Sequence, residues 1–153
     1  MQCDHTHSAH QLMGIAEERC RDQGVRFTPI RRRVFEMISE SSAGLKAYEL
    51  LDRLSTEHAA ARPPTVYRAL DFLMEQGLVH RVESHNTFIA CPCPQPEPTH
   101  RGGYQLVICR QCGRVEEMHE PAVNKVLAEL VSEHGFTLEH QTIELTGLCA
   151  ECR

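Results

Sequence analysis

The sequence predicts an α+β protein built from two units, and three features of the chain support this expectation. Apolar residues recur at helical spacing up to about residue 77, and two short strand-like runs follow. Residues 92–103 contain four of the eight prolines, a composition typical of a linker. Beyond the linker, two Cys-x-x-Cys pairs indicate a small unit stapled by metal. We therefore expect one domain at residues 1–91 and a second at residues 104–153.

Four helices are expected in the first unit, after a mobile tail at residues 1–11. Thr28 precedes Pro29, which places a capping hydroxyl before a proline at the first helical position. Gly24 and Gly77 fit the ends of helical patterns. The expected helices span about residues 12–23, 29–38, 47–58 and 63–76, and two strands are expected at about residues 78–83 and 87–91.

This order of helices followed by a two-stranded hairpin is the plan of a winged helix-turn-helix domain. In that motif the second helix enters the major groove of DNA. Here that helix would be residues 63–76, with Tyr67 and Arg68 exposed near its start. The run Arg31–Arg33 on an earlier helix cannot all face a core, so it meets solvent or phosphate. The net charge of −5 leaves both a local phosphate-binding patch and an ordinary solvated face open.

The second unit, residues 104–153, is expected to mix strands with one helix. The expected strands cover about residues 104–109, 114–118 and 136–146, and the helix covers about residues 121–134. Some fifty residues are too few to bury a sizeable core, so this unit needs a staple or a partner. The apolar face of its helix comprises Val123, Val126, Leu127, Leu130 and Val131.

The staple is expected from four cysteines, Cys109, Cys112, Cys149 and Cys152. Two cysteines spaced by two residues on a turn bring their sulfurs together, and two such turns complete a tetrahedron for zinc. Four thiolates fill the coordination sphere, so the site has no position for a catalytic water. Free or oxidised thiols would leave the unit without its staple.

Further metal ligands lie on both sides of the linker. His80 and Cys91 precede it, His100 lies within it, and Glu116 and Glu117 follow it. Any one of these residues alone is more often structural. A metal that joined them would fix the angle between the two units.

Several sequence runs resemble the ferric uptake regulator family, most closely its zinc uptake regulator branch. They are residues 46–51, 63–73 and 77–84, together with the Cys-x-x-Cys-Gly motif at Cys109. The resemblance covers roughly residues 12–152. It implies a cytoplasmic, homodimeric bacterial repressor of zinc-uptake genes. A winged-helix domain would bind palindromic double-stranded operator DNA, and the C-terminal α/β domain would dimerise.

The resemblance also implies the roles of individual residues. Cys109, Cys112, Cys149 and Cys152 would hold a structural zinc, whereas His80, Cys91, His100 and Glu117 would hold a sensory zinc, giving two Zn²⁺ per chain. One thiolate with two imidazoles and a carboxylate favours zinc over iron(II) or manganese. The DNA contacts would come from Tyr48, Arg68, Thr65 and Tyr67, with Arg31 and Arg32 on phosphates.

The chain departs from the family pattern in three places. Iron-sensing members carry a His-rich run before the first cysteine pair, and this chain has Gly-Gly-Tyr-Gln there, which argues against iron. His100 stands about two residues further from Cys109 than the pattern places it. For the extra metal site of some members only His140 fits, while Asn124 replaces a Glu, so we expect no third site.

Other classes of protein receive less support. The chain lacks His-Glu-x-x-His, Gly-x-Ser-x-Gly and His-x-Glu, so we expect no enzyme and no small-molecule substrate other than zinc. Its apolar runs are too short to span a membrane. A zinc-buffering protein could use the same ligands, but the exposed Tyr67 and Arg68 would then have no purpose. A sibling regulator of the same family that senses iron, manganese or peroxide also stays open.

Overall fold

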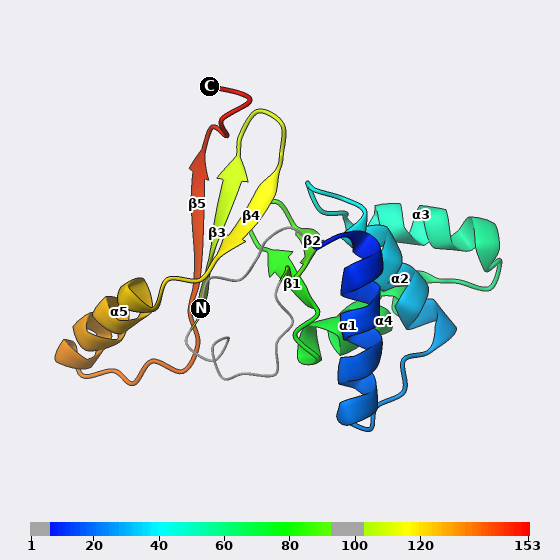
Figure 1. The fold of residues 1–153 in the computed structure, drawn as a ribbon, viewed down its shortest axis with the longest axis horizontal. Helices are drawn as coiled ribbons and strands as arrows, with labels where there is room; N and C mark the ends of the chain where they lie inside the picture. The colour runs from blue at the N-terminus through cyan, green and yellow to red at the C-terminus, as the bar shows by residue number, and fades with distance from the viewer. Residues whose placement is uncertain (1–6, 93–102) are drawn as a thin grey trace. The chain divides into compact units, whose positions relative to one another are not determined.

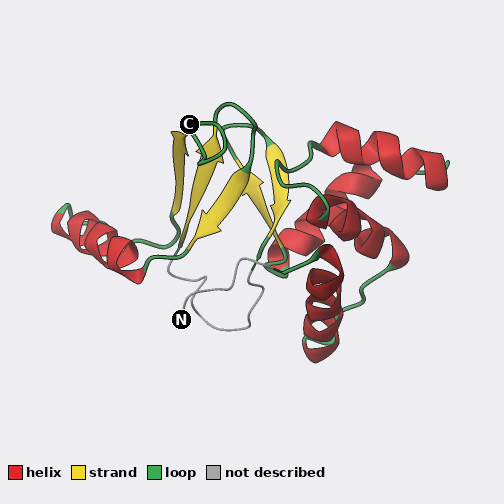
Figure 2. Ribbon diagram, turned by 45° about the horizontal axis from the view of Figure 1, so that its top comes forward, coloured by secondary structure: helices red, strands yellow, loops and turns green. Residues whose placement is uncertain are grey.

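The computed structural model describes residues 7–92 and 103–153. The described residues divide into two compact units, one at residues 7–92 and one at residues 103–153 (Figure 1). No helix within the described ranges is long and apolar enough to cross a membrane. The expected α+β class is confirmed, with a helical unit and a mainly stranded unit (Figure 2).

Local capping explains where the first helices begin. Ser8 accepts a hydrogen bond from the backbone of Gln11, whose side chain accepts one from Ser8 in return. This capping box starts the first helix at Ala9, so the helix includes residues that we assigned to a tail. Thr28 caps the second helix as expected, through the backbone N–H of Arg31. The unit contains α1 (Ala9–Asp22), α2 (Pro29–Ser39), α3 (Ala47–Glu57), α4 (Pro63–Glu75), β1 (Val79–Val82) and β2 (Thr87–Ala90).

Helix α2 lies at the centre of the first unit and packs against α1, α3, α4 and β2. Phe35, Ile38, Leu50 and Leu70 are fully buried in its core. Strands β1 and β2 form the antiparallel hairpin of the wing, with His80 opposite Ile89. The same core takes in Ala16 of α1, Val79 of β1 and Phe88 of β2, so burial joins the four helices and the wing in one unit.

The second unit is a three-stranded sheet with the order β4-β3-β5. Strand β3 (Tyr104–Cys109) pairs antiparallel with β4 (Val115–Met118) and parallel with β5 (Thr142–Gly147). The parallel connection runs through helix α5 (Pro121–Glu133), which lies off one end of the strands in Figure 1. Leu106 and Ile108 of the central strand are fully buried.

One expectation for this unit was wrong. The strand expected at residues 136–146 begins only at Thr142, because Tyr104 pairs with Thr142 and no residue of β3 precedes Tyr104 to pair with earlier positions. Among the described residues, α5 has no buried side chain and its apolar face is exposed, as expected of a unit too small to bury a sizeable core. Val126 and Leu130 are 53% and 47% exposed.

Candidate metal centres and nucleic-acid interface

The four cysteines of the paired motifs meet at one end of the β4-β3-β5 sheet. Cys109 ends β3 and Cys149 follows β5, and these strands run parallel, with Cys109 opposite Gly147. The four sulfur atoms of Cys109, Cys112, Cys149 and Cys152 all lie within 4.8 Å of one another. A tetrahedron with zinc–sulfur bonds of about 2.3 Å has sulfur–sulfur edges of about 3.8 Å. The sulfurs of Cys112 and Cys149 are 3.8 Å apart, so this group has the dimensions of a zinc site.

Backbone N–H groups donate hydrogen bonds to the Cys109 sulfur and so stabilise its thiolate form, which is the form that binds a cation. The N–H of Cys149 lies 3.4 Å from the sulfur of Cys109 and donates to it. Hydrogen bonds from the backbone of Cys112 and then of Cys149 lower the pKa of Cys109 to about 6. A hydrogen bond with Cys149 and burial raise the pKa of Cys152 to about 12. Without a metal the cluster therefore favours one thiolate and resists further ionisation, and a bound divalent cation removes that resistance.

A second pair of metal donors lies in the wing of the first unit. His80 is on β1 and 8% exposed, and Cys91 follows β2 and is fully buried. The backbone N–H of Cys91 donates to the carbonyl of Leu78, which holds the end of the hairpin against the start of β1. One ring nitrogen of His80 and the sulfur of Cys91 lie within 4.8 Å of each other. An imidazole and a thiol at this separation can share a zinc ion.

The two candidate acidic ligands of the second unit, Glu116 and Glu117, are neighbours on β4 and differ in burial. Glu117 is 5% exposed, whereas Glu116 points to solvent and pairs with Arg114 at 2.9 Å. Successive side chains of a strand face opposite sides, so only one of the two can face inward. The burial pattern favours Glu117 as a ligand. His100 lies outside the described residues.

The residues expected to read DNA are presented to solvent. Tyr48 lies in the first turn of α3 and is 62% exposed, and Tyr67 in α4 is 53% exposed. Arg68 follows Tyr67 on α4 and is also exposed. The Thr65 hydroxyl accepts a hydrogen bond from the N–H of Arg62 at 3.0 Å, so it helps to cap the start of α4. Tyr48 on α3 and Tyr67 and Arg68 on α4 are therefore all accessible to solvent.

The arginines of α2 have partners within the chain, which the sequence did not reveal. The guanidinium carbon of Arg31 lies 3.8 Å from the centre of the Phe72 ring. Arg32 pairs with Glu17, fifteen residues earlier. Such pairs depend on how α1 and α4 pack against α2, and no local pattern signals them. Arg31 and Arg32 are therefore held at fixed positions, and Glu17 offsets the charge of Arg32.

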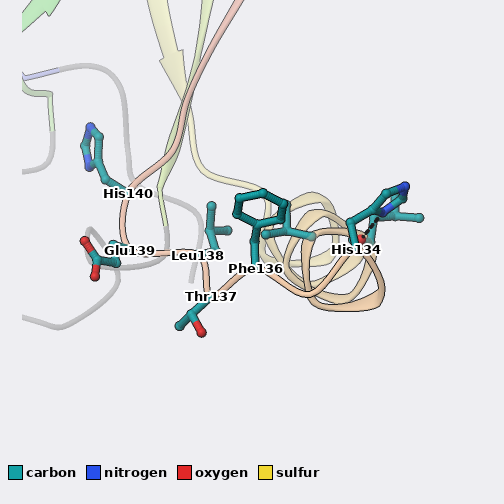
Figure 3. Close-up of a pocket in the computed structure, with 8 residues that line it drawn as sticks. His134, Phe136, Thr137, Leu138, Glu139 and His140 are labelled. Carbon is teal, nitrogen blue, oxygen red and sulfur yellow. Dashed lines mark hydrogen bonds between the residues drawn. The ribbon is translucent and has the colours of Figure 1, made fainter.

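His140, the residue that fitted a third metal site, lies near an open hollow beyond α5. The hollow measures about 640 Å³, and its apolar lining includes Leu130, Phe136 and Leu138 (Figure 3). His134 lies at its rim and its Nδ1 is 2.8 Å from the carbonyl oxygen of Leu130. The Nε2 atom of His140 is 3.3 Å from the hydroxyl of Thr142. The hollow is thus mainly an apolar surface.

Comparison with known proteins identifies the chain's relatives. Residues 22–146 match the model of the ferric uptake regulator family. The zinc uptake regulation protein of Escherichia coli is 42% identical over 145 residues, which cover 95% of this chain and 83% of that protein. A solved zinc uptake regulator complexed with zinc and DNA superposes with a TM-score of 0.88 at 41% identity, covering 96% of each chain. The peroxide operon regulator of Bacillus subtilis is 28% identical over 95% of each chain.

The chain has a winged helix-turn-helix unit followed by an α/β unit with a four-cysteine cluster. This combination defines the class of metal-dependent, DNA-binding regulators to which the matched proteins belong. The chain belongs to the ferric uptake regulator family. Within the family the chain is more similar to the zinc uptake regulation protein of Escherichia coli, at 42% identity, than to the peroxide operon regulator of Bacillus subtilis, at 28%. The expected family and branch are confirmed.

Proposed function

We propose that this protein is a zinc-responsive transcriptional repressor of zinc-uptake genes that binds palindromic operator DNA as a zinc-loaded homodimer. One observation carries the proposal, namely the two metal donors within the wing of the DNA-binding unit. His80 and Cys91 lie within 4.8 Å of each other and are both buried. A metal bound there acts directly on the unit that presents Tyr67 and Arg68 to DNA. The similarity to zinc uptake regulators supports the choice of metal.

Two zinc ions per chain are proposed, with different roles. Cys109, Cys112, Cys149 and Cys152 hold the structural zinc, which adds its binding energy to the folding of the second unit. His80, Cys91, His100 and Glu117 hold the sensory zinc. When bound, zinc would cross-link these side chains, which come from the two units and from the segment between them. Because the thiol of Cys91 must lose its proton to bind, affinity falls as the pH falls.

The sensory ligands act through a shift in population. Without zinc, no metal ties the ligands of one unit to those of the other, and the winged units of a dimer adopt many separations. With His80 and Cys91 tied to His100 and Glu117, the units are held at one spacing that fits two half-sites. Arg68 then donates to a guanine edge, an interaction that contributes about 1–3 kcal/mol of discrimination. The α2 arginines contact phosphates without reading sequence.

The second unit supplies the dimer interface in this proposal. Helix α5 has no buried residue, and a helix of 13 residues is marginally stable in water without packing. Large apolar side chains are exposed along this helix and just after it. Those on α5, at helical spacing, are Val123, Val126 and Leu130, and Phe136 follows the helix. A second copy of the same face would bury these residues. The four-cysteine site takes part in no catalytic step, because four thiolates leave no open coordination position on the metal.

We place the protein in the cytoplasm.

Selection from a random duplex-DNA library tests the function, with parallel arms in buffered free zinc and in a chelator. We expect one palindrome to be enriched in the zinc arm alone. Cys91→Ser should abolish this enrichment, and Cys20→Ala is the matched control because Cys20 is a buried cysteine of the same unit that belongs to neither group of possible metal ligands among the described residues.

Each other outcome points elsewhere. Enrichment with iron(II) or manganese but not zinc would assign the chain to a sibling regulator. Equal enrichment with zinc and with chelator would contradict a sensory role for His80 and Cys91. No enrichment in any arm would overturn DNA binding and favour a zinc-buffering protein.

A further inference from the structure

Three side-chain amides meet where the second unit begins. Gln105 of β3, only 2% exposed, donates through Nε2 to Oδ1 of Asn124 on α5 at 2.8 Å. Gln141, just before β5, donates through Nε2 to the same Oδ1. Asn124 in turn donates through Nδ2 to the carbonyl oxygen of Gly103 at 3.1 Å. The oxygen Oε1 of Gln105 accepts from the backbone N–H of Glu120 at 3.0 Å. We call Gln105, Asn124 and Gln141 the amide clamp.

The amide clamp joins three segments that are distant in sequence. They are Gly103 with the following strand β3, the N-terminal end of α5, and the residue before β5. The fit is close, because a side chain at Gly103 would collide with Gln141 and the backbone there has φ of +95°. A residue other than glycine would be strained at that φ as well.

Helix α5 depends on this clamp for its position. The helix buries no residue within the chain and lies off the end of the strands, so apolar packing does not fix its direction (Figures 1 and 2). The bonds to Glu120 and Asn124 reach its N-cap and its first turn. A helix held by polar bonds at one end keeps its apolar face at a defined angle to the sheet.

We propose that the amide clamp positions α5 so that its apolar face meets a second copy of the chain, and that Asn124 is its central positioning residue. The inference rests on the proposed homodimer and adds the residues that set its geometry. Asn124 suits this role because one amide both accepts two N–H donors and donates to Gly103. A carboxylate would keep the two accepted bonds and lose the donated one.

Dimer dissociation constants from sedimentation at several concentrations test the proposal on the full zinc-loaded chain. We expect Asn124→Ala and Gln105→Leu each to raise the dissociation constant about tenfold, because each leaves buried polar groups without partners. The double variant should raise it by less than the product of the two, since both act in one network. Asn124→Asp should have a smaller effect than Asn124→Ala. Lys125→Ala, an exposed neighbour on the same helix, is the matched control.

Two further measurements separate positioning from general loss of structure. Zinc retained by the four cysteines and an unchanged circular dichroism spectrum show that the variants are folded. Amide hydrogen exchange at Glu120 should accelerate in Gln105→Leu and stay unchanged in Lys125→Ala.

Three results would overturn the clamp. They are a dissociation constant of Asn124→Ala equal to that of Lys125→Ala, additive effects in the double variant, and unchanged exchange at Glu120. If the unmodified protein does not dimerise at all, the proposed homodimer fails, and exchange at Glu120 still decides whether Gln105 anchors α5.

Discussion

The guanidinium group of Arg33 on α2 binds the carboxylate of Glu57 at the end of α3 through three hydrogen bonds of 2.6 to 3.1 Å. Arg33 also donates to Glu36 at 2.6 Å. The hydrogen bonds from Arg33 hold the pKa of Glu57 below its usual value. The pair thus joins two helices that are far apart in sequence, and it does so through a planar, two-pronged contact.

Glu57→Gln should lower the thermal midpoint at pH 7. Since the pKa of Glu57 is lower in the folded than in the unfolded chain, its contribution is present above the unfolded value of about 4.3 and is lost as the pH falls further. The difference between the variant and the unmodified protein should therefore shrink below about pH 4. It should also shrink in high salt, because both groups are partly exposed. Scanning calorimetry across pH measures this, with Glu18→Gln as control.

Cys149→Ser should remove one zinc ion per chain and destabilise the second unit. The variant loses one of four sulfurs that lie within 4.8 Å of one another. Metal analysis after dialysis against a weak chelator gives the zinc content. Cys20→Ala should keep the full content, because Cys20 is buried in the core of the first unit. Full zinc content in Cys149→Ser would contradict the structural site.

Glu117→Gln should raise the free zinc needed for half-maximal DNA binding by at least about tenfold. The neighbouring Glu116→Gln should leave it unchanged, because Glu116 is exposed and pairs with Arg114. Fluorescence anisotropy of labelled operator DNA in zinc buffers gives both values. Equal effects of the two substitutions would assign the result to net charge instead of ligation.

Cys20 should resist alkylation in the folded protein. Its side chain is 1% exposed, and burial raises the pKa of its thiol. Only the thiolate reacts, so both effects slow the reaction. Mass spectrometry after iodoacetamide treatment should show labelling at least about 100-fold slower than in the guanidinium-unfolded chain. Rapid labelling would mean that α1 detaches readily from the core.

Val126→Glu should convert the proposed dimer into a monomer with little loss of folding. Val126 is 53% exposed on α5, so a charge there costs the isolated chain little. A charge buried between two copies without a partner would be costly. Sedimentation velocity measures the outcome, and Ser132→Glu near the end of α5 is the control. A persistent dimer would place the interface elsewhere.

Sequence reasoning succeeded where structure depends on neighbours along the chain. The cap at Thr28 and the spacing of the cysteine pairs are local signals, and they located α2 and the four-cysteine cluster. Ser8 and Gln11 formed a comparable signal for α1, and the His-rich N-terminal residues masked it.

Features that depend on distant segments could not be predicted from the sequence. The start of β5 is set by the length of β3, and the pairing of Arg32 with Glu17 is set by helix packing. The amide clamp also escaped notice, because Asn124 meets partners 17 to 21 residues away. Hydrogen bonds between amide side chains produce no periodic pattern of apolar residues from which they could be predicted.

The parallel pairing of β3 with β5 has a consequence for synthesis on the ribosome. Tyr104 pairs with Thr142, so the central strand waits for most of the second unit to be made before its last partner exists. The first unit, in contrast, has its own core from α1 to β2 and can fold while the rest is still being translated. Cys149 and Cys152 follow β5 and are made later still, so a metal bound by the four cysteines would be among the last parts of the unit to be added.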